Sequence, residues 1–287
     1  MSTGLALTLE AARTFLFVPA DRPERFAKAA ASGADIVILD LEDAVAPEHK
    51  ELARRHAATA LASGIASGVR INGVESFWFD DDCAAIAATA CVVVLPKSQS
   101  QRDIRALDAA LARPPVVLAL VETAAGILAA LEIAQCLPVV RLALGSLDLA
   151  AELGVAPTNR VALASARSQL VLASSAARIA PPVDGVTESI DDEAELADDI
   201  AYARGLGFTG KLCIHPRQVA PTSRLFDPTR GEVEWAEAVV GAALGAGAAG
   251  VVVIDGRMVD RPVVERAKRI LSRRRPAVIH TNEGRDV

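Results

Sequence analysis

Residues 37–47 of this 287-residue chain read VILDLEDAVAP. The apolar run at 37–39 is followed at once by the carboxylates of Asp40, Glu42 and Asp43. A buried carboxylate is unfavourable unless it is paired, hydrogen-bonded or bound to a metal. The stretch therefore has two interpretations. The acids either offset the dipole at a helix N-terminus, or they end a buried strand at the mouth of an active site.

Apolar runs of this kind recur along the chain, each followed by a polar cluster and an Ala-rich stretch typical of a helix. They occupy residues 15–20, 35–43, 68–73, 91–97, 115–123, 140–149, 182–189 and 208–216. Uniformly apolar strands are typical of parallel sheets covered by helices. Residues 13–230 therefore predict an α/β fold, a TIM (β/α)8 barrel, with a doubly wound parallel sheet as the alternative.

Residues 231–275 exceed what one barrel needs. They suggest a helix near 231–246, a Gly/Ala-rich bend, a short VVVIDG run and a second helix near 261–275. We expect this helical extension to cap the barrel or to pack on a neighbouring subunit, and residues 276–287 to form a disordered tail. The GAGAAG stretch at 245–250 matches a dinucleotide fingerprint only by letter, because a helix precedes it and a strand follows it.

Composition and sequence pattern argue against several classes of partner and location. The formal net charge of −6 argues against nucleic acid or an anionic membrane surface. No apolar run reaches the roughly 18 residues that a membrane span needs. Glu10 and Arg13 interrupt an N-terminus that lacks a basic start, so we expect no signal peptide. The 4 cysteines show no CxxC spacing, which favours a reducing cytoplasm.

The chemistry of a TIM barrel lies at the carboxyl ends of its strands. The last residues of the eight runs supply many polar side chains, namely Asp40, Glu42, Asp43, Arg70, Asn72, Lys97, Glu122, Asp148, Glu188 and His215. Any one of them could be a solvated loop residue or a helix cap. Packing does not explain the whole set, so the sequence predicts an active site at this end.

Two carboxylates and one arginine stand out in this set. Glu122 and Asp148 each follow a long apolar run, and two carboxylates with open positions for ligand and water suit Mg²⁺ better than zinc. Capping of the next helices is the alternative. Arg70 lies between two apolar residues, so its guanidinium would enter the rim and bind a carboxylate bidentately. An internal ion pair with an acid near Asp40 is the alternative.

The segments FVPADRPERFAKA, LDLEDAVAP, VRING, LPK, VETAAG, GSLDL, GFTGKLCIHPRQ and GRMVDRPVV together resemble one family over about residues 13–274. It is the citrate lyase β-subunit-like CoA-ester lyases of the HpcH/HpaI aldolase superfamily. The resemblance implies a TIM barrel that binds Mg²⁺ and cleaves or forms a carbon–carbon bond next to a CoA thioester. It implies that Glu122 and Asp148 hold the metal, and that Arg70 and Glu122 bind the substrate.

The resemblance also implies roles for further residues of these motifs. Asp260, in the MVD motif, would reach a neighbouring subunit's active site as acid or base. Asp43 stands where the pyruvate-aldolase branch has a catalytic His. A pyruvate-aldolase activity would therefore lack its base in this chain, and Asp43 becomes a further catalytic candidate. The opening segment contributes to the CoA site, which makes Arg22, Lys28 and Lys97 candidate CoA contacts.

The resemblance therefore implies a Mg²⁺-dependent lyase that splits a hydroxyacyl-CoA such as malyl-, citramalyl- or citryl-CoA into an acyl-CoA and a 2-oxo acid. Two alternatives remain: a hydroxyacyl-CoA thioesterase, and a citrate lyase β subunit that acts on an acyl-carrier-bound citryl thioester. Leu147 stands where many relatives have Glu, and the acyl group stays open. The family typically forms trimers, so we expect a homo-oligomer, a trimer or hexamer.

Overall fold

The computed structural model of the chain describes residues 3–245, 252–254 and 257–274. Eight parallel strands close a barrel in the order β1 to β8, which confirms the TIM barrel and excludes the doubly wound sheet. Every strand ends before its predicted run does. The strands are β1 (Thr14–Pro19), β2 (Ile36–Asp40), β3 (Gly68–Arg70), β4 (Val92–Leu95), β5 (Val116–Val121), β6 (Val139–Leu144), β7 (Ala180–Asp184) and β8 (Gly210–Cys213).

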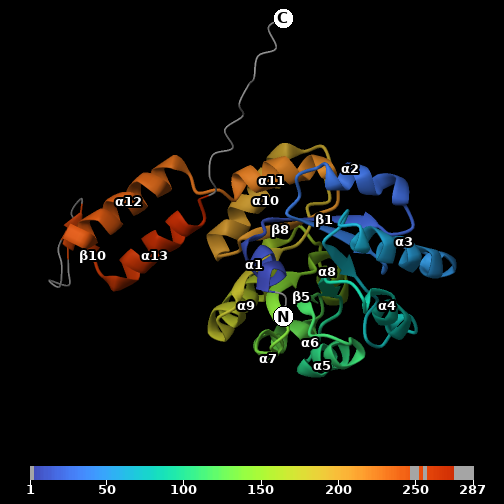
Figure 1. The fold of residues 1–287 in the computed structure, drawn as a ribbon. Coiled ribbons are helices and arrows are strands. Elements are labelled where there is room, and N and C mark those ends of the chain that lie inside the picture. The colour runs from blue at the N-terminus through green and yellow to red at the C-terminus, as the bar shows by residue number, and fades with distance from the viewer. Residues whose placement is uncertain (1–2, 246–251, 255–256, 275–287) are drawn as a thin grey trace, which may run out of the picture. The chain divides into compact units, whose positions relative to one another are not determined.

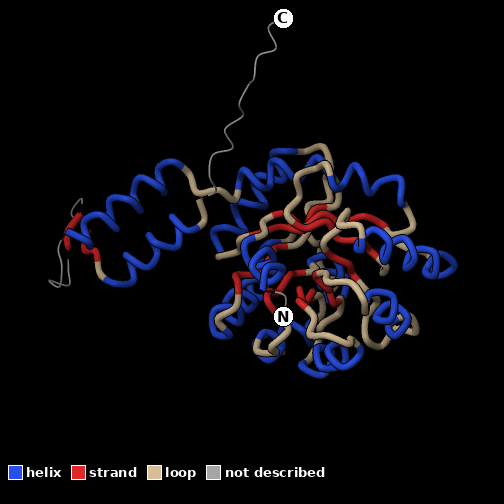
Figure 2. Tube along the Cα trace, in the orientation of Figure 1, coloured by secondary structure: helices blue, strands red, loops and turns tan. Residues whose placement is uncertain are grey.

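Helices alternate with these strands and surround the barrel (Figure 1). The strands lie at the centre and the helices form the outer layer (Figure 2). Helix α1 (Thr3–Ala11) precedes the first strand, and short turns η1 (Pro23–Arg25), η2 (Pro47–His49) and η3 (Pro216–Gln218) precede three later helices. Those that follow strands are α2 (Phe26–Ala30), α3 (Lys50–Ala62), α4 (Phe79–Ile86), α5 (Gln101–Ala110), α6 (Ala124–Leu128), α7 (Ala130–Ala134), α8 (Ser146–Leu153), α9 (Arg160–Ala177), α10 (Glu193–Leu206) and α11 (Val219–Leu225).

Side chains that alternate along the strands form two separate apolar clusters. Ile38 and Leu118 belong to the cluster inside the barrel, whereas Leu39 and Val117 belong to the one under the helices. At the amino-terminal end, the buried Arg141 guanidinium donates to carbonyl oxygens of the α1 segment, at 3.2 Å from that of Leu9. The barrel is therefore closed at that end, and its open mouth is at the carboxyl ends of the strands.

Residues 227–287 make a second compact unit, as far as they are described. It contains α12 (Arg230–Gly245), an antiparallel hairpin of β9 (Val252–Ile254) and β10 (Arg257–Val259), and α13 (Arg261–Ser272). The predicted helical extension is confirmed, and the VVVIDG run supplies a hairpin strand. Residues 246–250 of the predicted bend, and the tail at 276–287, lie outside the described residues. Across the described helices, none is both long enough and apolar enough to cross a membrane.

Candidate active site

Neighbouring strands carry the predicted polar residues to one side of the barrel mouth. Asp40 and Arg70 end β2 and β3 and lie opposite each other in the strand register. Glu122 directly follows β5, and Lys97 lies two residues beyond β4. Because side chains alternate along a strand, Asp40 continues the inward-facing side that includes Ile38. The sequence therefore places these charged groups at the top of the barrel interior.

Arg70 is held rigidly by the carboxylates of β2 and its loop. Its Nε donates to Asp40 Oδ1 at 2.8 Å and its Nη2 to Asp40 Oδ2 at 2.5 Å. Its Nη1 lies 3.0 Å from Glu42 Oε2, and the Phe17 ring lies 5.0 Å from its guanidinium carbon. Burial opposes the charge, but Asp40 and Glu42 raise the pKa of Arg70 above its usual value. The internal ion pair left open by the sequence therefore exists.

Glu42 links Arg70 to Lys97. Its Oε1 lies 2.5 Å from Lys97 Nζ, while its other oxygen faces Arg70. Burial raises the pKa of the Glu42 carboxyl, and the two cations oppose that rise. Asp43 lies farther out, 3.8 Å from Arg70 Nη1 with 59% of its side chain exposed. Asp43 is thus the acid of this loop that solvent or substrate reaches, and its catalytic role stays a prediction.

Glu122 is buried, with 1% of its surface exposed. Its Oε1 accepts a hydrogen bond from the Lys97 backbone N–H at 2.8 Å. Helix α6 is capped by Thr123, whose Oγ1 accepts the Gly126 N–H at 3.1 Å, so Glu122 is not the cap. Burial, then the charges of Glu42 and Asp148, raises the pKa of Glu122 to about 8. A buried carboxylate among other carboxylates is a suitable place for a cation.

Asp148 lies in the first turn of α8, beyond β6, and is exposed. Its charge acts on Glu122. Among the described residues, no three or more His, Cys, Asp or Glu side chains are arranged to hold a metal. Two carboxylates leave most coordination positions to substrate oxygens and water, which fits Mg²⁺ rather than zinc. The donor set therefore fits the predicted metal, and the role of Glu122 and Asp148 as its protein ligands stays a prediction.

Gly145 makes room for Glu122. A Cβ atom at this position would lie 2.4 Å from both Cβ and Oε2 of Glu122. The register that pairs Val121 with Leu144 brings the next residues of β5 and β6, Glu122 and Gly145, side by side. Apart from its place in GSLDL, no sequence pattern marks this glycine. Its small size is required for the position of the candidate metal ligand.

We expect Gly145→Ala to displace the Glu122 carboxylate and to weaken Mn²⁺ binding about tenfold or more. Isothermal titration of the substrate-free protein measures this affinity. Gly205→Ala is the matched control, because an added Cβ at Gly205 on α10 meets nothing within 4 Å. If both variants bind Mn²⁺ as the wild type does, the close contact does not position Glu122.

Lys50 fixes the loop that carries Glu42, and the sequence did not reveal it. The buried Nζ donates to the Leu41 oxygen at 2.5 Å, the Glu42 oxygen at 2.7 Å and Asn72 Oδ1 at 2.9 Å. Burial lowers the pKa of Lys50, while Asp82 opposes that shift. A lysine at the start of a charged helix is normally exposed. Asn72, predicted at the rim, is therefore part of this supporting network.

Glu188 does not end a strand, which corrects the predicted extent of the seventh run. Strand β7 ends at Asp184, whose Oδ1 accepts from Arg167 Nε at 2.8 Å. Beyond it, the Thr187 hydroxyl donates to Asp199 Oδ2 at 2.6 Å, so this segment packs against α10 as a loop. Glu188 is exposed on that loop. The acid that ends β7 is therefore Asp184, not Glu188.

His215 caps a turn after β8. Its Nδ1 accepts the Arg217 N–H at 3.2 Å. Burial, with help from Lys28, lowers the pKa of His215. The structure thus brings Lys28 and His215 near each other, on the β8 and β1 side of the mouth.

The three candidate CoA contacts separate into two groups. Arg22 and Lys28 follow β1 and are exposed, with Arg22 Nε 3.8 Å from Asp21 Oδ1. Lys97 instead follows β4 and extends its ammonium to Glu42 in the loop after β2. A CoA role for Arg22 and Lys28 stays a prediction, and Lys97 has a different set of contacts.

A cleft of about 730 Å³ opens beside the ion pair of Glu42 and Lys97. It is lined by residues of the segments that follow β2, β3 and β4, including Val45, Trp78 and Arg102. Both apolar and polar groups border it, as is usual for small-molecule sites. The cleft provides space for a substrate next to the charged cluster.

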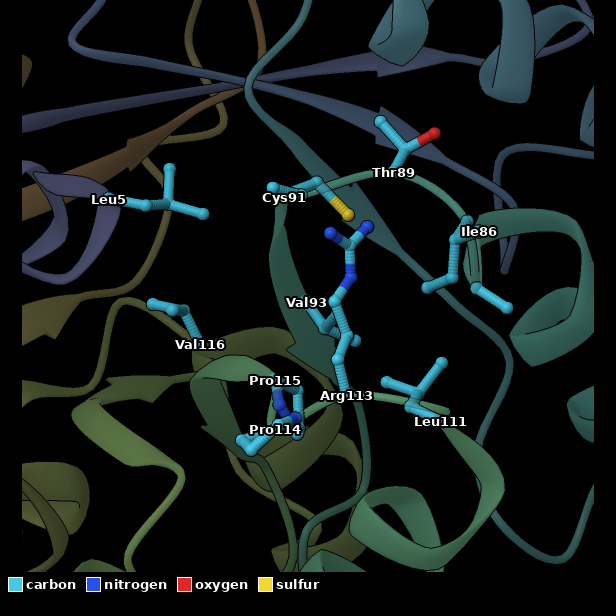
Figure 3. Close-up of a pocket in the computed structure, with 12 residues that line it drawn as sticks. Leu5, Ile86, Thr89, Cys91, Val93, Leu111, Arg113, Pro114, Pro115 and Val116 are labelled. Carbon is cyan, nitrogen blue, oxygen red and sulfur yellow. The ribbon is translucent and has the colours of Figure 1, made fainter. Parts of the chain in front are cut away.

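A second pocket of about 60 Å³ lies at the other end of the strands. Figure 3 shows Arg113 directed toward the Cys91 thiol, close to the starts of β4 and β5. Burial raises the pKa of Cys91 to about 11, which keeps the thiol protonated. Because TIM-barrel chemistry occurs at the carboxyl ends of the strands, we do not assign this pocket to the active site.

The fold and the mouth define a class: TIM barrels whose carboxylates at the strand ends hold a divalent metal beside a fixed arginine. Residues 13–216 match the model of the HpcH/HpaI aldolase/citrate lyase family, and the chain belongs to that family. This confirms the resemblance seen in the sequence motifs.

Relatives share nearly the full length of the chain. A citrate lyase subunit beta-like protein of Mycobacterium tuberculosis is 39% identical over 90% of this chain and 94% of its own. A (3S)-malyl-CoA thioesterase of Cereibacter sphaeroides is 34% identical over 91% and 94%. The crystal structure of CitE from M. tuberculosis with magnesium, acetoacetate and coenzyme A has a TM-score of 0.81 and 37% identity, covering 92% of this chain and 98% of that one. Its ligands agree with the predicted Mg²⁺ and CoA thioester.

Proposed function

We propose that the protein is a Mg²⁺-dependent carbon–carbon lyase that converts a hydroxyacyl-CoA thioester, such as malyl-, citramalyl- or citryl-CoA, into an acyl-CoA and a 2-oxo acid. The buried carboxylate of Glu122, with Asp148 and the fixed guanidinium of Arg70, is the observation that carries this proposal. The magnesium, acetoacetate and coenzyme A of the CitE neighbour support the ligand classes.

The protein's residues would act by orientation and proton transfer. Mg²⁺ held by Glu122 and Asp148 would supply Lewis acidity for the hydroxyl oxygen of the substrate. Asp40 binds Nε and Nη2 of Arg70, so a substrate carboxylate would approach Nη1, which contacts Glu42 at 3.0 Å in the substrate-free protein. When the carbon–carbon bond breaks, the hydroxyl proton would pass to a base, and the acyl-CoA enolate would take a proton from a general acid. We propose Asp260 of a neighbouring subunit as that acid, with Asp43 as a further candidate.

The same residues could serve a thioesterase. The metal could direct water to the acyl carbon instead, and the 34% identical (3S)-malyl-CoA thioesterase favours this second candidate. A citrate lyase β subunit that requires an acyl carrier protein is the third. Whichever activity applies, 4 buried free thiols suit a reducing compartment, so we propose that the enzyme is cytoplasmic. We also propose that it forms trimers or hexamers, as its family typically does.

An activity panel with purified protein, Mg²⁺ and the three CoA esters separates these functions. A lyase releases a 2-oxo acid and keeps the thioester, whereas a thioesterase releases free CoA thiol. Formation of a 2-oxo acid without thiol supports the proposal. Thiol release without 2-oxo acid would replace it with the thioesterase. Activity only on a carrier-bound thioester would favour the citrate lyase subunit.

We expect Arg70→Lys to lower kcat/KM at least about tenfold, or about 1.4 kcal/mol of transition-state stabilisation. Lysine keeps the charge but loses the planar fork that Asp40 and a substrate carboxylate need. Arg105→Lys, at an exposed position on α5, is the control. Unchanged kcat/KM together with a lower melting temperature would make Arg70 a structural ion-pair partner instead.

A further inference from the structure

Lys97 has an unusual backbone conformation for its residue type. Its φ is +49°, and Arg178 is the other non-glycine residue in the described segments with positive φ. Arg178 ends helix α9, where a left-handed residue is common. Lys97 instead follows β4 at the barrel mouth. Residues with side chains keep this strained conformation where their surroundings hold it, so the contacts of Lys97 matter.

The left-handed turn at Lys97 points its polar atoms at two separate carboxylates. The Lys97 N–H donates to Glu122 Oε1 at 2.8 Å, and its Nζ lies 2.5 Å from Glu42 Oε1. The next N–H, of Ser98, donates to the Leu120 oxygen at 3.1 Å and ties the turn to β5. One residue therefore joins the candidate metal ligand to the acid that contacts Arg70.

From this geometry we propose that Lys97 is a positioning residue of the metal site rather than a CoA contact, an inference that rests on the proposed metal site. Its N–H fixes one oxygen of Glu122, which leaves the second oxygen for the cation. Its ammonium neutralises Glu42, whose negative charge would otherwise repel Glu122.

The ion pair and the strained backbone depend on each other. Glu42 is buried while 44% of the Lys97 side chain is exposed, so solvent screens this ion pair in part, and the pair still helps to hold the left-handed turn. In Lys97→Ala the strain remains but the ion pair is lost, and the turn relaxes away from Glu122. Lys97→Gly also loses the ammonium, but glycine adopts positive φ freely and keeps the N–H in place. Both variants carry the same charge, so a difference between them reports the backbone.

Mn²⁺ affinity of the full-length, substrate-free proteins, measured by electron paramagnetic resonance, tests the backbone role. We expect Lys97→Ala to bind Mn²⁺ about fivefold more weakly than Lys97→Gly. Lys97→Met, which keeps the apolar stem, should resemble Lys97→Ala and replaces it if that variant does not fold. The pair Arg178→Ala and Arg178→Gly is the control, since both should bind Mn²⁺ equally.

Activity measurements with two substrates test the positioning role of the Lys97 ammonium group. Lys97→Gly should lower kcat/KM by the same factor for a CoA ester and for the matching pantetheine thioester. A loss confined to the CoA ester, or no loss, would overturn the positioning role of the side chain. Equal Mn²⁺ affinity of Lys97→Ala and Lys97→Gly would overturn the positioning role of the Lys97 backbone. Failure of the wild type to bind Mn²⁺ would instead contradict the metal site itself, and with it this inference.

Discussion

Glu122→Ala and Asp148→Ala should each abolish Mg²⁺-dependent turnover, with a loss of about a thousandfold or more in kcat, which corresponds to about 4 kcal/mol. These two carboxylates are the proposed protein ligands, so removal of either leaves half of the set. Mn²⁺ binding by isothermal titration should be lost in parallel. If either variant keeps near-normal activity at limiting Mg²⁺, the ligand assignment is wrong.

Glu122→Gln provides the control for folding. The pKa of Glu122 is raised from its ordinary value of 4.5 to about 8 in the folded protein. Between about pH 4.5 and pH 8 the folded state therefore binds more protons than the unfolded state. By linkage, this group lowers the stability of the metal-free wild type as pH rises through that window. Metal-free Glu122→Gln should therefore melt higher than the wild type at pH 8 and equally near pH 4. Mg²⁺ should raise the melting temperature of the wild type only.

The barrel was predictable because its signal is repeated and local. Eight apolar runs with helical stretches between them specify the fold even when individual ends are misjudged. The seventh run shows why ends fail. Val186 and Thr187 look like strand residues, and only the bond from Thr187 to Asp199 on α10 shows that the chain has already left the sheet. Strand ends depend on such tertiary partners, which a local pattern does not contain.

The composition of the site was predictable, but its bonding was not. Arg70 could bind substrate or an internal acid, and the choice of Asp40 follows from the register of β2 with β3. Lys97 binds Glu42 from 55 residues away, and Lys50 binds Asn72 from 22 residues away. Contacts over such separations arise only after the barrel closes. The sequence therefore indicated which groups gather at the mouth, while their pairing required the structure.

Asp260→Asn and Glu122→Ala proteins should each be nearly inactive, yet a mixture of the two should regain activity. A general acid contributes about 100- to 10,000-fold to rate, so loss of the ionisable group at 260 is severe. We propose that Asp260 serves the barrel of a neighbouring subunit. In a randomly exchanged equal mixture, a site then combines an intact Glu122 barrel with an intact Asp260 neighbour in about one case in four. Activity should return to about a quarter of the wild-type value.

The choice of asparagine separates this role from the structural one. Asp260 caps α13, because its Oδ1 accepts the Val263 N–H at 3.2 Å. Asparagine keeps that acceptor and caps helices about as well as aspartate, whereas alanine loses the cap at a cost of about 1 kcal/mol. Native mass spectrometry of differently tagged chains establishes subunit exchange. If chains exchange and no activity returns, each site uses the Asp260 of its own chain or none. If Asp260→Asn alone is fully active, the carboxylate serves only as the cap of α13.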